Sequence, residues 1–156
     1  MVVHGQGLLH RQLRGVLDVD GEAGVVAIVV RRYECQNCGA VMTVVPAGML
    51  ARRQYSASSI ALALHLWLEL GWSDQRVRRR ICAWQVRGRN ARGWAQLYRW
   101  ARQAASLFRL PRMIPVVHRV DETAKRVLLA LRSLAPIALS AASIMVQVFE
   151  GAARTR

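Results

Sequence analysis

The sequence is short of acidic residues. Nine Asp and Glu stand against 23 Lys and Arg in 156 residues, so the formal net charge is +14, and 22 of the basic residues are arginine. Between Arg76 and Val120 there are twelve arginines and no carboxylate. A solvated protein surface normally mixes both signs of charge. This single-sign stretch therefore predicts a polyanionic partner, and we expect that partner to be nucleic acid.

The scarcity of carboxylates also argues against catalysis. The acids of residues 18–22 lie in one predicted β-turn, whereas a two-metal nuclease needs carboxylates gathered from separate elements. Those at 121–122 are typical of the start of a helix. The sequence has no glycine-rich phosphate loop and no nucleophile elbow, and His65 and His118 are isolated. We therefore expect no enzymatic activity.

Cysteine is rare as well, with three residues in the chain. So low a count excludes a disulfide framework, and no signal-peptide pattern is present, so we expect a protein of the reducing cytoplasm. The C-terminal apolar run, Leu134–Phe149, has 16 residues, fewer than the ~20 that a helix needs to span a bilayer. We expect a buried helix of a bundle there and no membrane association.

The first 48 residues have the composition of β structure. Apolar and β-branched residues dominate three runs, Leu13–Val19, Val25–Tyr33 and Ala40–Val45, and turn-forming residues separate them. Pro46 ends the third run. We therefore predict a small antiparallel β module over residues 1–50.

From Ser56 onward, apolar residues recur with helical spacing. Ser56 and Gly71 are expected to cap and to end a first helix, which is apolar on nearly all sides and so belongs in the centre of a bundle. Ser73 and Asp74 open a short second helix, and Asn90 is expected to cap a third. The predicted buried face of the third helix consists of Trp94, Leu97, Tyr98, Ala101, Ala105 and Phe108.

A last helical region begins at Asp121, and Pro136 must kink or split it. The predicted fold class is therefore α+β. The β module is followed by a helix-turn-helix-like helical domain over residues 55–110 and by a C-terminal helical region over residues 120–150.

The helical domain has the order of a helix-turn-helix: a long helix, a short helix and a third helix with a basic face. In that motif the third helix enters the major groove, where Arg reads guanine and Gln reads adenine. The residues predicted to face bases are Arg92, Gln96, Arg99 and Arg102. Those predicted to hold phosphates are Arg78, Arg79, Arg80, Arg87 and Arg89, and Arg76 belongs to the same exposed face. The competing interpretation is an ordinary arginine-rich amphipathic helix in a bundle, and the turn before the third helix is long for the motif.

Cys35 and Cys38 form the pattern C-x-x-C-G with Gly39. Such a corner lets two thiolates converge on one metal, with backbone N–H groups bonding the first sulfur and Gly39 closing the turn at positive φ. Three interpretations stay open: a zinc knuckle, a redox dithiol, and a pair of cysteines kept in a turn without metal. The redox interpretation is the weakest, because thioredoxin-type pairs begin a helix, whereas a strand is predicted to follow here.

A structural zinc site takes four ligands, and this pair supplies two. The upstream candidates for the others are His4 and His10, whose spacing lies at the edge of what zinc fingers use. Cys82 stands in the helical half and is expected to be a small buried hydrophobic residue. Zinc is therefore the expected cofactor, with an incomplete set of ligands.

Residues 32–39 read R-Y-E-C-Q-N-C-G, and T-V-V-P follows at 43–46 and A-R-R-Q-Y-S at 51–56. This order resembles bacterial zinc-ribbon plus helix-turn-helix proteins related to the N-terminal DNA-binding region of insertion-sequence transposases, many of which lack the nuclease domain. The resemblance covers residues 3–108 and implies binding of double-stranded DNA. It also implies that Cys35 and Cys38 are the second ligand pair of a zinc ribbon, whose first pair would stand just upstream of His4 and is not part of this sequence.

A second hypothesis concerns protein partners. The apolar positions of the C-terminal region would form the surface of a homodimer or of a protein-interaction module in a degenerate mobile-element protein. These positions are Val127, Leu128, Leu131, Leu134, Ile137, Leu139 and Ile144. The two hypotheses are compatible, because dimers that read paired DNA half-sites are common.

Overall fold

The computed structural model describes residues 2–50, 52–84, 93–110 and 119–155, with strands first and helices after them. The strands are β1 (Val3–Val16), β2 (Ala23–Cys35) and β3 (Val41–Val44). The helices are α1 (Ala57–Leu68), α2 (Asp74–Ile81), α3 (Ala95–Leu107), α4 (Val120–Ser133), the 3-10 helix η2 (Ile137–Leu139) and α5 (Ile144–Ala153). The predicted α+β class, with an antiparallel sheet followed by a helical bundle, is confirmed.

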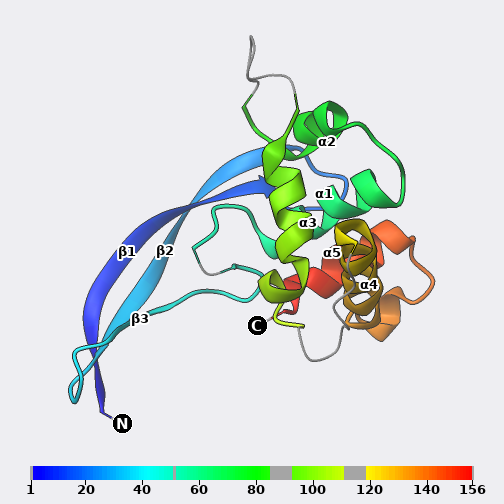
Figure 1. The fold of residues 1–156 in the computed structure, drawn as a ribbon. Helices are drawn as coiled ribbons and strands as arrows, with labels where there is room; N and C mark the ends of the chain where they lie inside the picture. The colour runs from blue at the N-terminus through cyan, green and yellow to red at the C-terminus, as the bar shows by residue number, and fades with distance from the viewer. Residues whose placement is uncertain (1, 51, 85–92, 111–118, 156) are drawn as a thin grey trace.

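The three strands form a long curved ribbon that projects away from the helices (Figure 1). The sheet is antiparallel with the order β1-β2-β3, and β3 pairs only with the outer end of β2. β1 pairs with β2 from Gly15 and Gly24 at the base to Val3 and Cys35 at the tip. We call this ribbon the arm, and the helices α1 to α5 with η2 the helical body.

β1 begins ten residues before the run that the sequence predicted, at Val3 instead of Leu13. The side chains of residues 3–10 are exposed on both faces of the arm, so they show no alternation of apolar and polar residues. Pairing of the backbone with β2 holds this part of the strand. The register shifts between Gly5 and Gly7, and Gly7 has a φ of +105°, which only glycine adopts at low cost.

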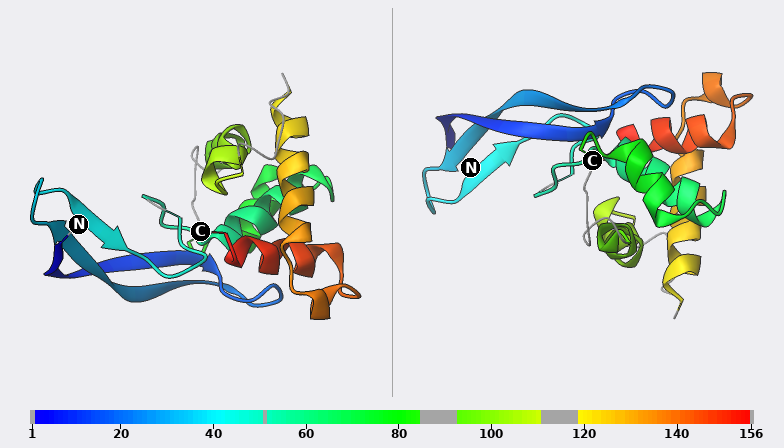
Figure 2. Two further views of the ribbon diagram at one scale, coloured as in Figure 1. Left: turned by 90° about the horizontal axis from the view of Figure 1, so that it is seen from below. Right: turned by 90° about the horizontal axis from the view of Figure 1, so that it is seen from above.

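Helix α1 is the centre of the helical body. Every residue from Ala57 to Leu66 is buried, and α2, α3, α4 and α5 all pack against this helix. Seen from below and from above, α3 and α5 lie on opposite sides of α1 (Figure 2). The hydroxyl of Ser56 accepts a hydrogen bond from the N–H of Ser59, as the predicted N-cap requires, and Gly71 has a φ of +65° just after the helix.

The buried face of α3 differs from the one predicted. Trp100 lies at its centre and is 1% exposed, whereas the ring of Tyr98 points to solvent and is 52% exposed. Both aromatic residues fit helical spacing, and Trp100 is the one whose ring packs edge-on against the rings of Tyr55 and Trp94, at centroid distances of 5.1 and 5.0 Å. The helix begins at Ala95, with the N–H of Trp94 donating to the carboxylate of Asp74, and the predicted cap Asn90 lies outside the described residues.

The C-terminal region also departs from the prediction. Val127, Leu128 and Leu131 are buried in the core, so they are not available as a partner surface. Ile137 and Ile144 do remain exposed. Pro136 separates α4 from η2 and α5, as expected. No helix in the described part of the chain combines the length and apolar character that crossing a membrane requires.

The arm is joined to the helical body where β1 meets the start of α1. The hydroxyl of Ser59 donates to the carbonyl of Val16, and it occupies the space beside Gly15 that a side chain would fill. The backbone of Arg14 bonds on both sides of Tyr55: its N–H donates to Gln54, and its carbonyl accepts from Ser56. These bonds fix the direction in which the arm leaves the helices.

Helices α4 and α5 approach each other most closely at Gly151. A methyl group at this position would overlap the carbonyl oxygen of Leu131, which belongs to the backbone of α4 and cannot rotate away. We predict that Gly151→Ala lowers the free energy of unfolding by about 2–3 kcal/mol, because the clash outweighs the better helix propensity of Ala. Urea denaturation measures the change.

Gly5→Ala is the matched control, because a methyl group at Gly5 meets no atom within 4 Å. We expect its unfolding free energy to stay within about 0.5 kcal/mol of the parent. Equal stability of the two variants would contradict the close approach of α4 and α5.

Candidate nucleic-acid interface and cysteine corner

The outer face of α3 carries a row of polar and basic side chains. Arg99, Arg102 and Ser106 follow each other at steps of three or four residues, so they share one side of the helix, and Arg109 comes just after its C-terminal end. All four are exposed, and Gln103 lies beside them. Neither Arg99 nor Arg102 forms a hydrogen bond or an ion pair with another described residue. We call these five residues the α3 row.

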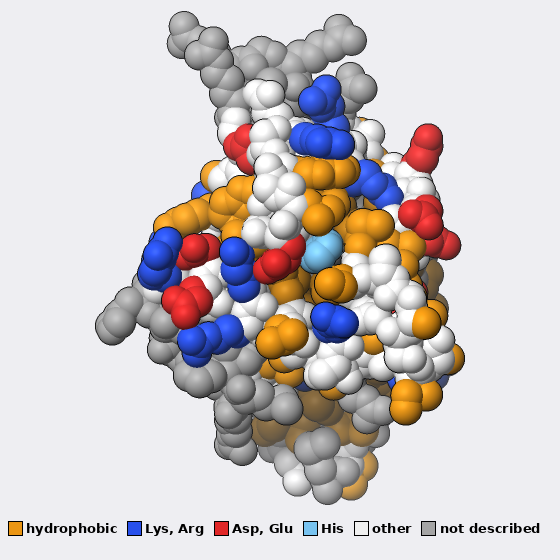
Figure 3. Space-filling model, turned by 90° about the vertical axis from the view of Figure 1, so that its right-hand side faces the viewer, with side chains coloured by type: hydrophobic (Ala, Val, Ile, Leu, Met, Phe, Trp, Pro, Cys, Tyr) orange, Lys and Arg blue, Asp and Glu red, His pale blue; other side chains and the backbone are white. Residues whose placement is uncertain are grey.

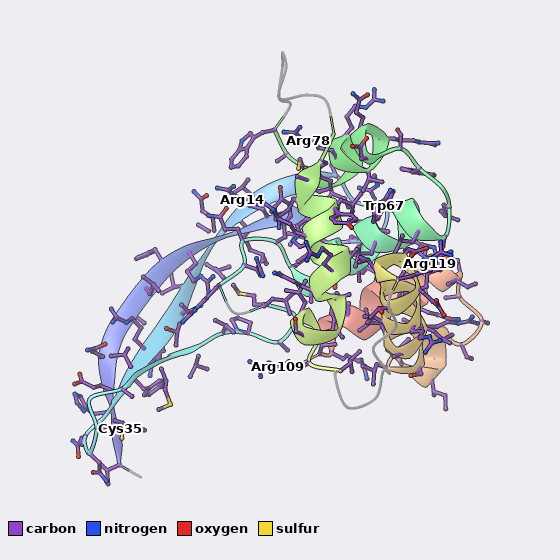
Figure 4. All side chains as sticks on the ribbon, viewed as in Figure 1. Arg14, Cys35, Trp67, Arg78, Arg109 and Arg119 are labelled. Atoms are coloured by element: carbon purple, nitrogen blue, oxygen red, sulfur yellow. The ribbon has the colours of Figure 1, made fainter. Side chains whose placement is uncertain are left out.

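A groove continues the α3 row toward the arm. It has a volume of about 870 Å³ and lies between β3, the loop of residues 45–53 and the C-terminal end of α3. Its arginines are Arg11, Arg52, Arg53 and Arg109, and no carboxylate is among its lining residues. Arg109 is labelled at the lower end of α3 in Figure 4. The row and the groove therefore form one continuous basic surface.

Two hydrogen bonds order the arginines at this junction. Arg53 donates to the side-chain oxygen of Gln103 at 2.6 Å, which ties the loop to α3. Arg11, from β1, donates to the carbonyl of Arg53 at 3.1 Å. The sequence prediction did not include the groove arginines. The adjacent pair Arg52 and Arg53 was the visible signal, but only the fold brings it beside α3.

The arginines of α2 occupy several different environments. Arg80 is half-buried and donates to the carbonyls of Val19 and Gly21, in the turn between β1 and β2. The guanidinium of Arg76 lies 3.7 Å from the centre of the Trp72 ring, a cation–π contact. Arg78 is half-buried, whereas Arg79 is exposed. The sequence predicted that the arginines of α2 share one phosphate-binding face. In the structure Arg80 and Arg76 have contacts within the protein, whereas Arg79 is exposed.

A second hollow lies between the turn and α2, with a volume of about 850 Å³. Arg78, Arg79 and Arg80 line it together with Asp20 and Glu22. The two carboxylates offset part of the positive charge, so this hollow is a weaker attractor of a polyanion than the groove beside α3.

Of the remaining predicted DNA-binding residues, the structure describes only Gln96. Gln96 stands in the first turn of α3 and is half-buried. Arg87, Arg89 and Arg92 lie outside the described residues. The segment 82–94 between α2 and α3 is far longer than the three- to four-residue turn of a standard helix-turn-helix.

The cysteine corner has the geometry that its sequence predicts. The backbone N–H groups of Asn37 and Cys38 donate to the sulfur of Cys35, and these bonds, with a side-chain hydrogen bond from Cys38, lower the pKa of the Cys35 thiol. Gly39 has a φ of +68°, and its N–H donates to the carbonyl of Cys35. Cys35 is buried in this turn, whereas Cys38 is exposed. Figure 4 shows Cys35 at the far end of the arm.

The histidines do not complete this corner. His10 pairs with Val29, six residues along β2 from Cys35, which places it about 20 Å away at ~3.3 Å per residue. His4 pairs with Glu34 and shares its face of the sheet, which is opposite to the face of Cys35. In the described ranges no three His, Cys, Asp or Glu side chains are grouped so that they could hold a metal ion. One copy of the chain thus presents two of the four ligands that structural zinc takes.

Cys82 lies far from this corner, at the end of α2. It is partly exposed, where a fully buried residue was expected, and its sulfur lies 3.0 Å from the hydroxyl of Tyr55. Burial and this contact raise the pKa of Tyr55.

Comparison with known proteins adds no relative to this description. No protein-family model, curated protein or solved structure matches the chain.

The two neighbouring arginines of α2 give a direct test of which side chains stabilise the fold. We predict that Arg80→Ala lowers the free energy of unfolding by about 1–3 kcal/mol, because two charge-assisted hydrogen bonds to half-buried carbonyls are lost. Arg79→Ala removes the same charge from the exposed side of α2 and should change it by less than about 0.5 kcal/mol. Urea denaturation of both variants measures the difference, and equal losses would contradict the assignment.

Proposed function

We propose that this protein binds duplex DNA, with Arg99 and Arg102 of α3 in the major groove and the arginines of the neighbouring groove, Arg109 included, on the phosphate backbone. The observation that carries the proposal is the continuous surface formed by Arg99, Arg102 and Arg109 with Arg11, Arg52 and Arg53. Six arginines gather there from β1, a loop and α3. No Asp or Glu is among the described residues that line the groove, and the sequence of α3 contains none.

The dimensions support a helix as the reading element. An α-helix with its side chains is about 10–12 Å across, and the DNA major groove is about 12 Å wide. α3 packs on α4 and α1 through its buried face, so the opposite face is open to a ligand. Arg is the side chain that forms bidentate bonds to guanine, and Arg99 and Arg102 are both exposed on this face.

Electrostatics distinguishes this face from the opposite side of the molecule. On the side that carries α4 and α5, Lys and Arg side chains alternate with Asp and Glu (Figure 3). There Arg126 pairs with Glu122 at 3.0 Å, and Arg119 with Asp121 at 3.5 Å. Mixed charges of this kind produce little net potential beyond a Debye length of about 8 Å. The unpaired arginines of the α3 row attract a polyanion over a longer range than this paired surface does.

The first experiment removes the centre of the row. We predict that the double variant Arg99→Ala/Arg102→Ala binds a short DNA duplex with an affinity at least about tenfold lower than that of the parent. The slope of log affinity against log salt should also flatten, because an interface with two fewer positive charges releases fewer counterions on binding. Fluorescence anisotropy over a salt series measures both quantities.

The control for this experiment is Arg119→Ala/Arg126→Ala. It removes the same total charge from α4, where each arginine already has a carboxylate partner. Its affinity and salt slope should stay close to those of the parent. If both double variants lose affinity equally, binding depends on net charge alone and the α3 assignment is wrong.

The second experiment addresses the groove. Arg52 and Arg109 both have positive φ, near +59° and +54°. Gln, like Arg, has an unbranched side chain, so Arg→Gln leaves the cost of this backbone conformation about the same. We predict that Arg52→Gln/Arg109→Gln weakens binding to all duplex sequences by the same factor, because phosphate contacts carry no base information. Competition between duplexes of different sequence tests this. A change in their order of affinity would place these arginines on bases instead.

A further inference from the structure

The hollow that α1, α4 and α5 form together has mainly apolar walls. It has a volume of about 550 Å³ and lies between the C-terminal end of α1, one face of α4 and the N-terminal end of α5. Its apolar lining residues are Leu70, Leu128, Leu129, Ile144, Met145 and Val148. Figure 3 shows this side of the molecule, where hydrophobic side chains surround a histidine. The volume falls in the range of about 300–1,000 Å³ that is typical of small-molecule sites.

We propose that this hollow binds a small carboxylic acid with an aliphatic chain. The chain lies on the apolar lining, and the carboxylate accepts a hydrogen bond from His65 in the positive field of Lys125 and Arg132. The hollow belongs to the side of the helical body that carries α4 and α5. The proposal therefore does not depend on DNA binding by the α3 row.

His65 is a buried polar side chain that the fold leaves without a partner. The residue is 5% exposed, it lines the hollow, and its Nδ1 atom has no hydrogen-bond partner among the described residues. Nearly all buried polar atoms of native proteins have a partner, so this atom indicates a place where a further group binds. Burial lowers the pKa of His65 below its ordinary value of 6.5 and outweighs the opposite effect of Glu69. The ring is thus neutral at pH 7, with one N–H to donate.

The nearby Gln147 shows how the same helices satisfy a buried polar group without a ligand. It is also 5% exposed, and it lines the neighbouring hollow beside η2. Its Nε2 donates to three backbone carbonyls between residues 139 and 142 at 2.9–3.2 Å, and its Oε1 accepts from Arg132 at 2.6 Å. The side chain of Gln147 therefore needs no further partner, whereas that of His65 does.

The charged side chains of the hollow favour an anion over a cation. Lys125 and Arg132 lie two turns apart on one face of α4, and Glu69 is the carboxylate among the described lining residues. The ion pairs that the described residues form lie elsewhere on α4, so these three charges are not neutralised by ion pairs. Two positive charges against one negative leave the walls with net positive charge. The first N–H groups of α5, which begins after its N-cap Ser143, add to this preference.

The lining also favours an aliphatic chain. No Phe, Tyr or Trp is among the described residues of the walls, and the thioether of Met145 adapts easily to the shape of a ligand. Leu129 and Ile144 are 66% and 49% exposed. A chain that covers them removes apolar surface from water, which is favourable in proportion to the area covered.

The experiment uses the 156-residue chain with sodium octanoate as the probe. We expect isothermal titration calorimetry to show saturable binding of one octanoate per chain. Its affinity should be at least about tenfold higher than that of acetate, which lacks the chain, and of octylammonium, which carries the opposite charge. The methyl NMR signals of Ile144 and Met145 and the ring nitrogen signals of His65 should shift on binding, while the methyl signal of Met42 on the arm should not.

The variant Lys125→Gln/Arg132→Gln removes both positive charges from the hollow. Both residues are exposed, so we expect the helical circular dichroism signal of the parent and an octanoate affinity at least about tenfold lower. The matched control is Arg119→Gln/Arg126→Gln, which removes two positive charges from the same helix outside the hollow. Its octanoate affinity should stay within about twofold of the parent.

Four results would overturn the proposal. Octanoate may bind no more tightly than acetate, the two double variants may lose affinity equally, or the His65 ring signals may stay unchanged at saturation. The fourth is a dimer that forms without ligand in sedimentation velocity and is lost in Leu129→Ser, because a second copy of the chain would then cover the hollow.

Discussion

The contact between Gly15 and Ser59 holds the two parts of the molecule together. Gly15, the residue before the last of β1, has no side chain, and the hydroxyl of Ser59 fills that space and donates to the carbonyl of Val16. Ser59 is itself held by the N-cap Ser56, whose hydroxyl donates to it at 2.7 Å. One short segment thus begins α1 and also fixes the arm. The place of the groove beside α3, and the distance of the cysteine corner from the helical body, both depend on this junction.

The same junction explains why the arginines of the chain have separate roles. Once the arm is fixed, the turn between β1 and β2 lies against α2, and Arg80 is used to hold it. Arg14, at the base of the arm, lies 4.3 Å from the ring of Trp84. Arginines near the junction therefore stabilise the fold, whereas those of the α3 row remain open to a ligand. The sequence does not distinguish these residues. It shows that each one is positively charged, but it does not show which of them will lie beside a backbone carbonyl in the fold.

The local signals in the sequence predicted the elements well. Ser56 and Ser73 cap helices, Gly39 closes the cysteine turn, and Pro136 separates two helices, because each effect needs only a few neighbouring residues. Long-range packing was less predictable. The choice of Trp100 over Tyr98 for the core depends on Tyr55, which lies 45 residues earlier in the sequence, and the full length of β1 depends on pairing with β2.

The same contrast between local signals and long-range packing applies to the candidate sites. The corner of Cys35 and Cys38 was predictable because its geometry is local, but whether a third ligand stands beside it depends on strand register. The groove arginines come from β1, a loop and α3, so no window of sequence contains them together. Residues that act through one element can be proposed from sequence, whereas residues gathered by the fold cannot.

The length of the arm also separates the energetics of its tip from those of the core. The corner is held by its own turn and by pairing of β2 with β1 and β3, and none of its bonds reaches the helical body. Sites that share no partners and lie far apart contribute independently to stability. A change at the tip of the arm is therefore expected to leave the stability of the core around α1 unchanged.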